Sequence, residues 1–169
     1  MKKLASLVLA LALVLTAVCA FAEVKSPLVD NMKIVATEGG EAEILPTDDD
    51  VQAEIARIID AVAEGTEVSD LFGEEAAVTL EGATDVLAVV KFQLEETDKE
   101  EVYVTFENLG IPFQGNVQCL IGVKNEAGVY EYTPVPTTVN NDGTVTILLK
   151  DEMLAAAIAA PVLGVFVQL

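Results

Sequence analysis

The residue types that carry out most enzymatic chemistry are scarce in this sequence. It has no His, the usual general base, and no Trp to stack on a sugar ring. After residue 22 the serines are Ser26 and Ser69, and neither lies in a G-x-S-x-G motif. P-loop and G-x-G-x-x-G motifs are also missing. The 28 Asp and Glu residues could form a glycosidase-like pair by chance, but so small a chain leaves little room for a sugar cleft. We therefore expect no enzymatic activity and no cofactor.

Acidic clusters offer the other possible chemistry, which is divalent-cation binding. Carboxylates are the ligands that Ca²⁺ prefers, and they gather at 38–43 and at Asp48, Asp49 and Asp50. Neither cluster has the alternating spacing of an EF-hand loop. Asp48–Asp50 directly precede a helical pattern, where carboxylates cap the helix and favour its dipole. We expect capping and no metal site, with cation binding by these three residues as the alternative.

Three tyrosines are the candidate ligand-binding residues. Tyr130 and Tyr132 are two positions apart and therefore share one face of a strand, while Tyr103 points away from the apolar face of its own strand. Exposed aromatic side chains on a sheet can bind a glycan or a partner protein. They can equally shield a half-buried sheet face, so both interpretations stay open.

The charge balance narrows the classes of partner. Nine Lys and Arg residues stand against 28 acids, which gives a formal net charge of −19. Nucleic acid and anionic membrane surfaces need a basic patch, so neither is expected as a partner. A protein or a glycan remains as the expected class of partner.

The N-terminus has the three parts of an export signal. Lys2 and Lys3 precede an apolar stretch over 4–18, and Ala20-Phe21-Ala22 forms a cleavage site. We expect a signal peptide over 1–22, cleavage after Ala22, a secreted product and no membrane span afterwards. Lipid attachment at Cys19 is the alternative. The remaining cysteine, Cys119, lies on an apolar strand face, so we expect it to be buried and unreactive.

Periodicity predicts two parts after the signal. Residues 23–85 form an acidic segment with a helix over about 48–64, because Val51, Ile55 and Ile58 recur at helical spacing and Gly65 follows. A short helical turn should follow and end at Gly73. Residues 86–169 read as strands, and we expect the two parts to form one folded unit.

The strand-like region alternates apolar and polar residues with turn signals between. Strands 86–94 and 102–106 are predicted to form a hairpin, and turns at 125–128 and 140–143 to form two more. An Ala-rich helix over 151–159 leads to a final strand, 162–169, apolar enough to be buried on both faces. The predicted fold class is α+β, mainly an antiparallel β-sandwich with the N-terminal helical segment packed on it.

Several segments resemble known proteins. These are AVAEGTEVSDLFGEEA, EVYVTFENLGIPFQGNVQCLIGV, and NNDGTVTIL followed by LGVFVQL. They are similar to small exported proteins of Gram-positive anaerobes that pair a helical N-terminal part with an immunoglobulin-like β-sandwich. The resemblance implies that fold and an extracellular location, and it implies no activity.

Two functions are consistent with these patterns. The first is a non-enzymatic secreted interaction module with an unknown partner. The second is a glycan- or small-ligand-binding protein that uses Tyr103, Tyr130 and Tyr132. Crowded carboxyls between residues 38 and 85 should also raise some pKa values, which would make the fold more stable at mildly acidic pH.

Overall fold

A computed structural model describes residues 32–109 and 115–169. The expected signal peptide over 1–22, its cleavage site and Cys19 lie outside the described residues. In the described residues the strands and helices are β1 Lys33–Glu38, β2 Ala42–Ile44, α2 Asp49–Ala63, the 3₁₀-helix η1 Val68–Asp70, α3 Glu74–Thr79, β3 Asp85–Leu94, β4 Glu101–Glu107, β5 Val117–Lys124, β6 Tyr130–Val135, β7 Thr137–Val139, β8 Val145–Lys150, α4 Asp151–Ala159 and β9 Val162–Gln168.

The strands form two antiparallel sheets that pack face to face. One sheet has four strands in the order β1-β4-β8-β7, and the other has five in the order β2-β3-β9-β5-β6. Between them lies an apolar cluster in which Phe106 packs edge-on against Phe92 and Phe166. The α+β class and the two-sheet arrangement are thus as predicted.

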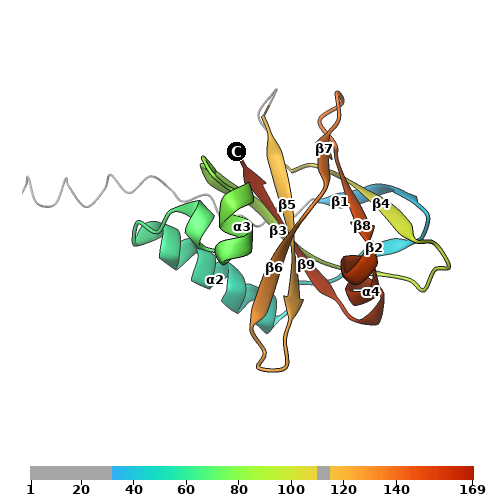
Figure 1. The fold of residues 1–169 in the computed structure, drawn as a ribbon, viewed down its shortest axis with the longest axis horizontal. Coiled ribbons are helices and arrows are strands. Elements are labelled where there is room, and N and C mark those ends of the chain that lie inside the picture. The colour runs from blue at the N-terminus through green and yellow to red at the C-terminus, as the bar shows by residue number, and fades with distance from the viewer. Residues whose placement is uncertain (1–31, 110–114) are drawn as a thin grey trace, which may run out of the picture.

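A layer of helices covers the other face of the five-stranded sheet (Figure 1). We call α2, η1 and α3 the helical layer. Val51, Ile55 and Ile58 of α2 pack in one cluster with Leu163 and Val165 of β9. The five-stranded sheet is therefore the middle layer of three. Strand β9 is buried on both faces, as its continuous apolar sequence predicted.

Local signals explain α2. The Asp48 side chain accepts a hydrogen bond from the Val51 backbone N–H at 3.1 Å, which makes Asp48 the N-cap. Gly65 follows the helix at a φ of +91°, a conformation that glycine adopts without steric cost. The predicted helix and its capping are confirmed.

The predicted hairpin of 86–94 with 102–106 is wrong. Strand β3 pairs with β2 and β9, whereas β4 pairs with β1 and β8 in the other sheet. Residues 95–100 thus cross from one sheet to the other. Both strands alternate apolar and polar residues with a period of two. This alternation shows which face of a strand is buried, but it does not show which strand pairs with it.

Three elements were missed in the acidic segment. Strands β1 and β2 lie before α2, so the sandwich draws on residues before position 86. The predicted short helical turn is present as η1 and ends before Gly73, but Gly73 is also the N-cap of helix α3, which was not predicted.

The other predictions for the strand region hold. Strands β5 and β6 form a hairpin around 125–128, and β7 and β8 form one around 140–143. Helix α4 joins the two sheets. Cys119 is fully buried between them and is a free cysteine, and burial raises the pKa of its thiol, so it stays protonated. In the described part of the chain no helix is both long and apolar enough to cross a membrane.

Candidate binding groove

An open groove runs between the helical layer and the β5–β6 hairpin. It encloses about 750 Å³, which is within the usual range of ligand pockets, about 300–1,000 Å³. Its apolar lining comes from both sides, and the members used below are Leu71, Phe72, Val129, Tyr130 and Tyr132. We call it the groove from here on.

Tyr132 forms the buried end of the groove. The Tyr132 ring packs against Gly122 of the neighbouring strand β5. A Cβ atom at position 122 would lie 2.6 Å from the tyrosine Cε1 atom, which is too close for a side chain. The ring also packs edge-on against Phe72, with centroids 5.0 Å apart. Only 7% of Tyr132 is exposed. The glycine thus provides the space in which this aromatic side chain is held.

A polar network joins Tyr132 to the helical layer. The Tyr132 hydroxyl donates a 2.6 Å hydrogen bond to Glu54 Oε1 on α2. Arg57 donates from Nε and a terminal nitrogen to the same carboxylate, at 3.0 and 2.7 Å. Its terminal nitrogens also approach the Leu71 carbonyl oxygen at 3.4 Å. The network fixes α2, β6 and the η1–α3 segment relative to one another.

The protonation states in this network follow from its contacts. Burial pushes the pKa of Glu54 upward, but hydrogen bonds from Arg57 and Tyr132, together with the arginine charge, outweigh burial and lower it. Burial and the bond to Glu54 raise the pKa of Tyr132. Glu54 is therefore ionised and Tyr132 is a neutral donor, which makes Tyr132 a poor nucleophile or base.

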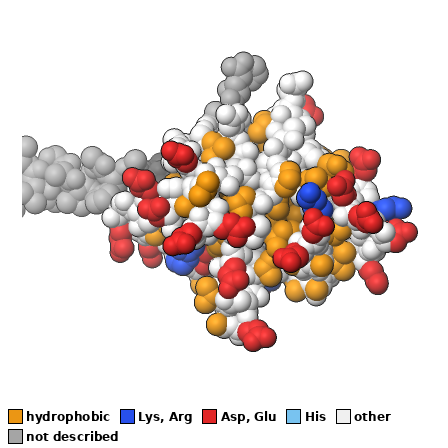
Figure 2. Space-filling model, viewed as in Figure 1, with side chains coloured by type: hydrophobic (Ala, Val, Ile, Leu, Met, Phe, Trp, Pro, Cys, Tyr) orange, Lys and Arg blue, Asp and Glu red, His pale blue; other side chains and the backbone are white. Residues whose placement is uncertain are grey.

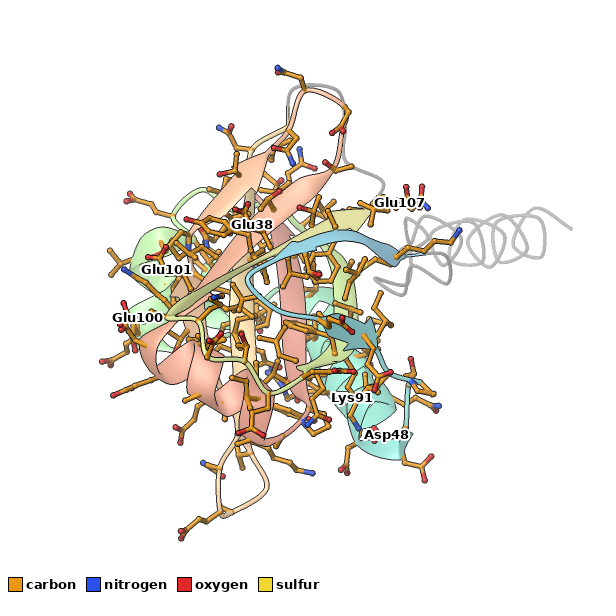
Figure 3. The ribbon with its side chains drawn as sticks, turned by 90° about the vertical axis from the view of Figure 1, so that its right-hand side faces the viewer. Glu38, Asp48, Lys91, Glu100, Glu101 and Glu107 are labelled. Carbon is orange, nitrogen blue, oxygen red and sulfur yellow. The ribbon has the colours of Figure 1, made fainter. Side chains whose placement is uncertain are left out.

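Two further ion pairs hold the N-terminal end of α2. The Lys124 ammonium lies 2.6 Å from Asp50 and 5.9 Å from the centre of the Tyr130 ring. The Lys91 ammonium of β3 pairs with Asp48, and Figure 3 shows these two side chains close together at the lower right, beside α2. Two basic residues of the sheet thus neutralise Asp48 and Asp50 at the start of this helix.

Basic neighbours lower the pKa of two carboxyls in the acidic segment, Asp48 and Glu54. Hydrogen bonds from Lys91 and from the Val51 backbone lower the pKa of Asp48, and that of Glu54 is also lowered. For these two carboxyls the direction is opposite to the expected rise, because each lies beside a basic side chain rather than beside other acids.

The tyrosines do not share one exposed face. Tyr130 and Tyr132 lie on the same face of β6, as predicted, with ring centroids 6.3 Å apart. Tyr132 is buried there under the helical layer, and Tyr130 is half-buried. Tyr103 lies in the four-stranded sheet, on its solvent face, where its hydroxyl is 3.3 Å from Glu101. A single three-tyrosine surface is therefore wrong, since residue spacing gives the face of each strand but not the sheet to which it belongs.

The Asp48–Asp50 cluster serves the helix. Asp48 caps α2 and pairs with Lys91, and Asp50 pairs with Lys124. Over residues 32–109 and 115–169 no group of three or more acidic or thiol side chains is placed to hold a metal ion. The capping interpretation is confirmed.

Sequence reasoning named Tyr130 and Tyr132 but missed the other residues that build the groove. Glu54 and Arg57 lie on one turn of the predicted helix, and Arg57 is the single base among fifteen acids between residues 38 and 85. That isolated positive charge was the sequence feature that could have indicated a role for Arg57. Phe72 is buried and forms part of the floor of the groove.

The groove lining combines an aromatic floor with charged side chains. Within the described residues the groove lining has no Ser, Cys or His, and its one buried hydroxyl is engaged with Glu54. No protein-family model matches the chain, and no curated protein or solved structure shows a significant match to it.

Proposed function

We propose that this protein is a non-enzymatic interaction module that binds a partner through the groove. One observation carries the proposal, which is the open groove of about 750 Å³ with an aromatic floor held rigid by a hydrogen-bonded network. A floor held in one conformation loses little entropy on binding, as is typical of binding sites.

The partner is a protein segment or a glycan. Tyr130 is the half-buried tyrosine of the groove, and its ring could stack on either. The proposal includes export by the predicted signal peptide and release after Ala22, which the sequence alone supports. An immunoglobulin-like relationship likewise rests on the resemblance of the segments quoted above.

Blocking the groove tests this function. Val129 lines the groove and is 60% exposed, so Val129→Trp should fill the groove without disturbing the core. Val78 is 81% exposed on α3 and is not part of the groove lining, so Val78→Trp is the matched control. The purified protein and both variants are applied to peptide and glycan arrays.

The expected result is a set of array signals that Val129→Trp loses and Val78→Trp keeps, with unchanged melting temperatures. Binding that survives Val129→Trp would place the interaction elsewhere on the molecule. An array with no signal from the wild-type protein would also count against the proposal.

A further inference from the structure

The groove has an unequal charge balance. Its lining includes two basic side chains, Arg57 and Lys124, and five acidic ones. The acids are Asp50, Glu54, Glu74, Glu75 and Glu131. Three acids therefore have no basic counterpart in the lining, and the local charge is negative.

The two bases are already neutralised. Arg57 forms its ion pair with Glu54 at 2.7 Å, and Lys124 forms its own with Asp50 at 2.6 Å. A ligand anion would have to compete with these carboxylates for either cation. Since the chain also carries a net charge of −19, an anionic ligand is disfavoured both locally and at long range.

The three remaining acids lie at the rim. Glu74, Glu75 and Glu131 are exposed, and across the described parts of the chain none of them forms a salt bridge. Glu131 accepts one hydrogen bond from the neutral Asn125 amide at 2.8 Å, which leaves its charge uncompensated. We call these three residues the rim acids.

The floor between the rim acids is apolar. Phe72 and Tyr132 form it, Tyr130 continues it toward the β5–β6 turn, and Val129 projects from that turn. In Figure 2, acidic and apolar side chains lie close together over the part of the surface formed by the helical layer and this turn. A matching ligand needs positive charges at its edges and apolar groups between them.

We infer that the groove binds a cationic peptide segment in which basic and apolar side chains alternate. The inference rests on the proposed function and names the partner's chemistry. An extended peptide directs successive side chains to opposite sides, so its apolar groups can contact the floor while its basic groups reach the rim acids. An uncharged glycan would use the floor and leave the rim acids unpaired.

The test measures the dissociation constants of three fluorescein-labelled peptides by anisotropy. The first peptide alternates lysine and leucine, the second replaces lysine by glutamate, and the third replaces leucine by serine. Only the first should bind well. Its affinity should fall as ionic strength rises from about 0.01 M to about 0.15 M, because the Debye length shrinks from about 30 Å to about 8 Å.

Matched variants separate the rim from the overall charge. Glu74→Gln with Glu75→Gln removes two neighbouring charges at the rim, and Glu95→Gln with Glu96→Gln removes two neighbouring exposed charges outside the groove. The rim pair should weaken lysine–leucine binding about fivefold, as expected for two exposed ion pairs. The control pair should change it less than about twofold. If the variant with Glu74→Gln and Glu75→Gln has a lower melting temperature, Glu131→Gln on β6 serves as a second rim variant.

The outcomes distinguish this inference from the proposed function. Equal weakening by the rim and control pairs, or equal binding of the lysine and glutamate peptides, would overturn the cationic-peptide inference. If binding is still lost in Val129→Trp, the groove function stands with a different ligand. Lysine–leucine binding that Val129→Trp does not affect would overturn both.

Discussion

The two faces of the five-stranded sheet are buried in different ways. Toward the four-stranded sheet, Phe92, Phe106 and Phe166 are fully buried in a cluster without polar side chains. Toward the helical layer, the cluster includes Tyr132, whose hydroxyl donates to the Glu54 carboxylate. The first face is closed by another sheet, while the second is left open as the groove at the β5–β6 end.

The difference shows how a small sandwich can gain a binding surface. On one side, a second sheet of four strands packs against the five-stranded sheet across a continuous apolar cluster. One 15-residue helix and two short ones cover only part of a five-stranded face. Where the helical layer ends, Tyr130 stays half-buried beside the buried Tyr132. The Tyr132 hydroxyl bonds to Glu54, because each buried polar group needs a partner.

The largest expected effect comes from removing a ring on the closed face. Phe106→Ala should lower the free energy of unfolding by about 3–5 kcal/mol, the usual cost of a large core cavity. Phe72→Ala removes the same ring from the floor of the groove, where solvent and neighbours can fill the space, so it should cost about 2 kcal/mol. Urea unfolding of both variants measures the difference.

Equal losses in the two variants would contradict this contrast. They would mean that the helical layer is packed as tightly as the sandwich and that the groove is closed in solution.

An intermediate effect is expected from the Tyr132 hydroxyl. Tyr132→Phe keeps the ring but removes the bond to an ionised carboxylate, and should cost about 1.5 kcal/mol. Tyr103→Phe removes a similar bond to Glu101 on an exposed face and should change stability by less than about 0.5 kcal/mol. Comparing the thermal unfolding of the two variants measures how much burial adds to the stability that a tyrosine hydrogen bond contributes. A loss from Tyr132→Phe no larger than that from Tyr103→Phe would contradict a stabilising role for the polar network.

The smallest effect concerns acid pH. The pKa of Glu54 is lower in the fold than its ordinary value of 4.5, so its contribution to stability is present above that pH. The contribution is lost as pH falls through the lower folded value. The pKa of Asp48 is also lowered, which acts in the same direction. We therefore expect the free energy of unfolding to decrease between about pH 5 and about pH 3.

Glu54→Gln should make that decrease shallower, because the substituted side chain no longer titrates. A rise in stability on acidification would support the opposite view, in which mutual repulsion of the acids outweighs their ion pairs. Denaturation midpoints over this pH range decide between the two.

Elements with local signals could be predicted from the sequence. Helix α2 has an N-cap and an apolar stripe, and the β5–β6 and β7–β8 hairpins have characteristic turns. Strand β1 was missed because it is an exposed edge strand with an irregular register, so its side chains do not alternate regularly. Helix α3 spans six residues, too few for helical periodicity to show.

The candidate site could be predicted only in part. The shared face of Tyr130 and Tyr132 follows from their spacing, and it was correct. The burial of Tyr132 and the separate location of Tyr103 do not follow from spacing, because they depend on which elements cover each sheet.

By itself, the sequence determined the local features of this protein: the capped helix, the tight turns, the apolar strand faces and the strongly negative charge. The first three depend on residues that are close neighbours along the chain, and the charge depends on composition alone. The tertiary structure decided that β3 and β4 belong to different sheets and that Glu54 meets a tyrosine 78 positions away. Those pairings, and the groove they create, depend on how whole layers pack, and no short stretch of sequence specifies that packing.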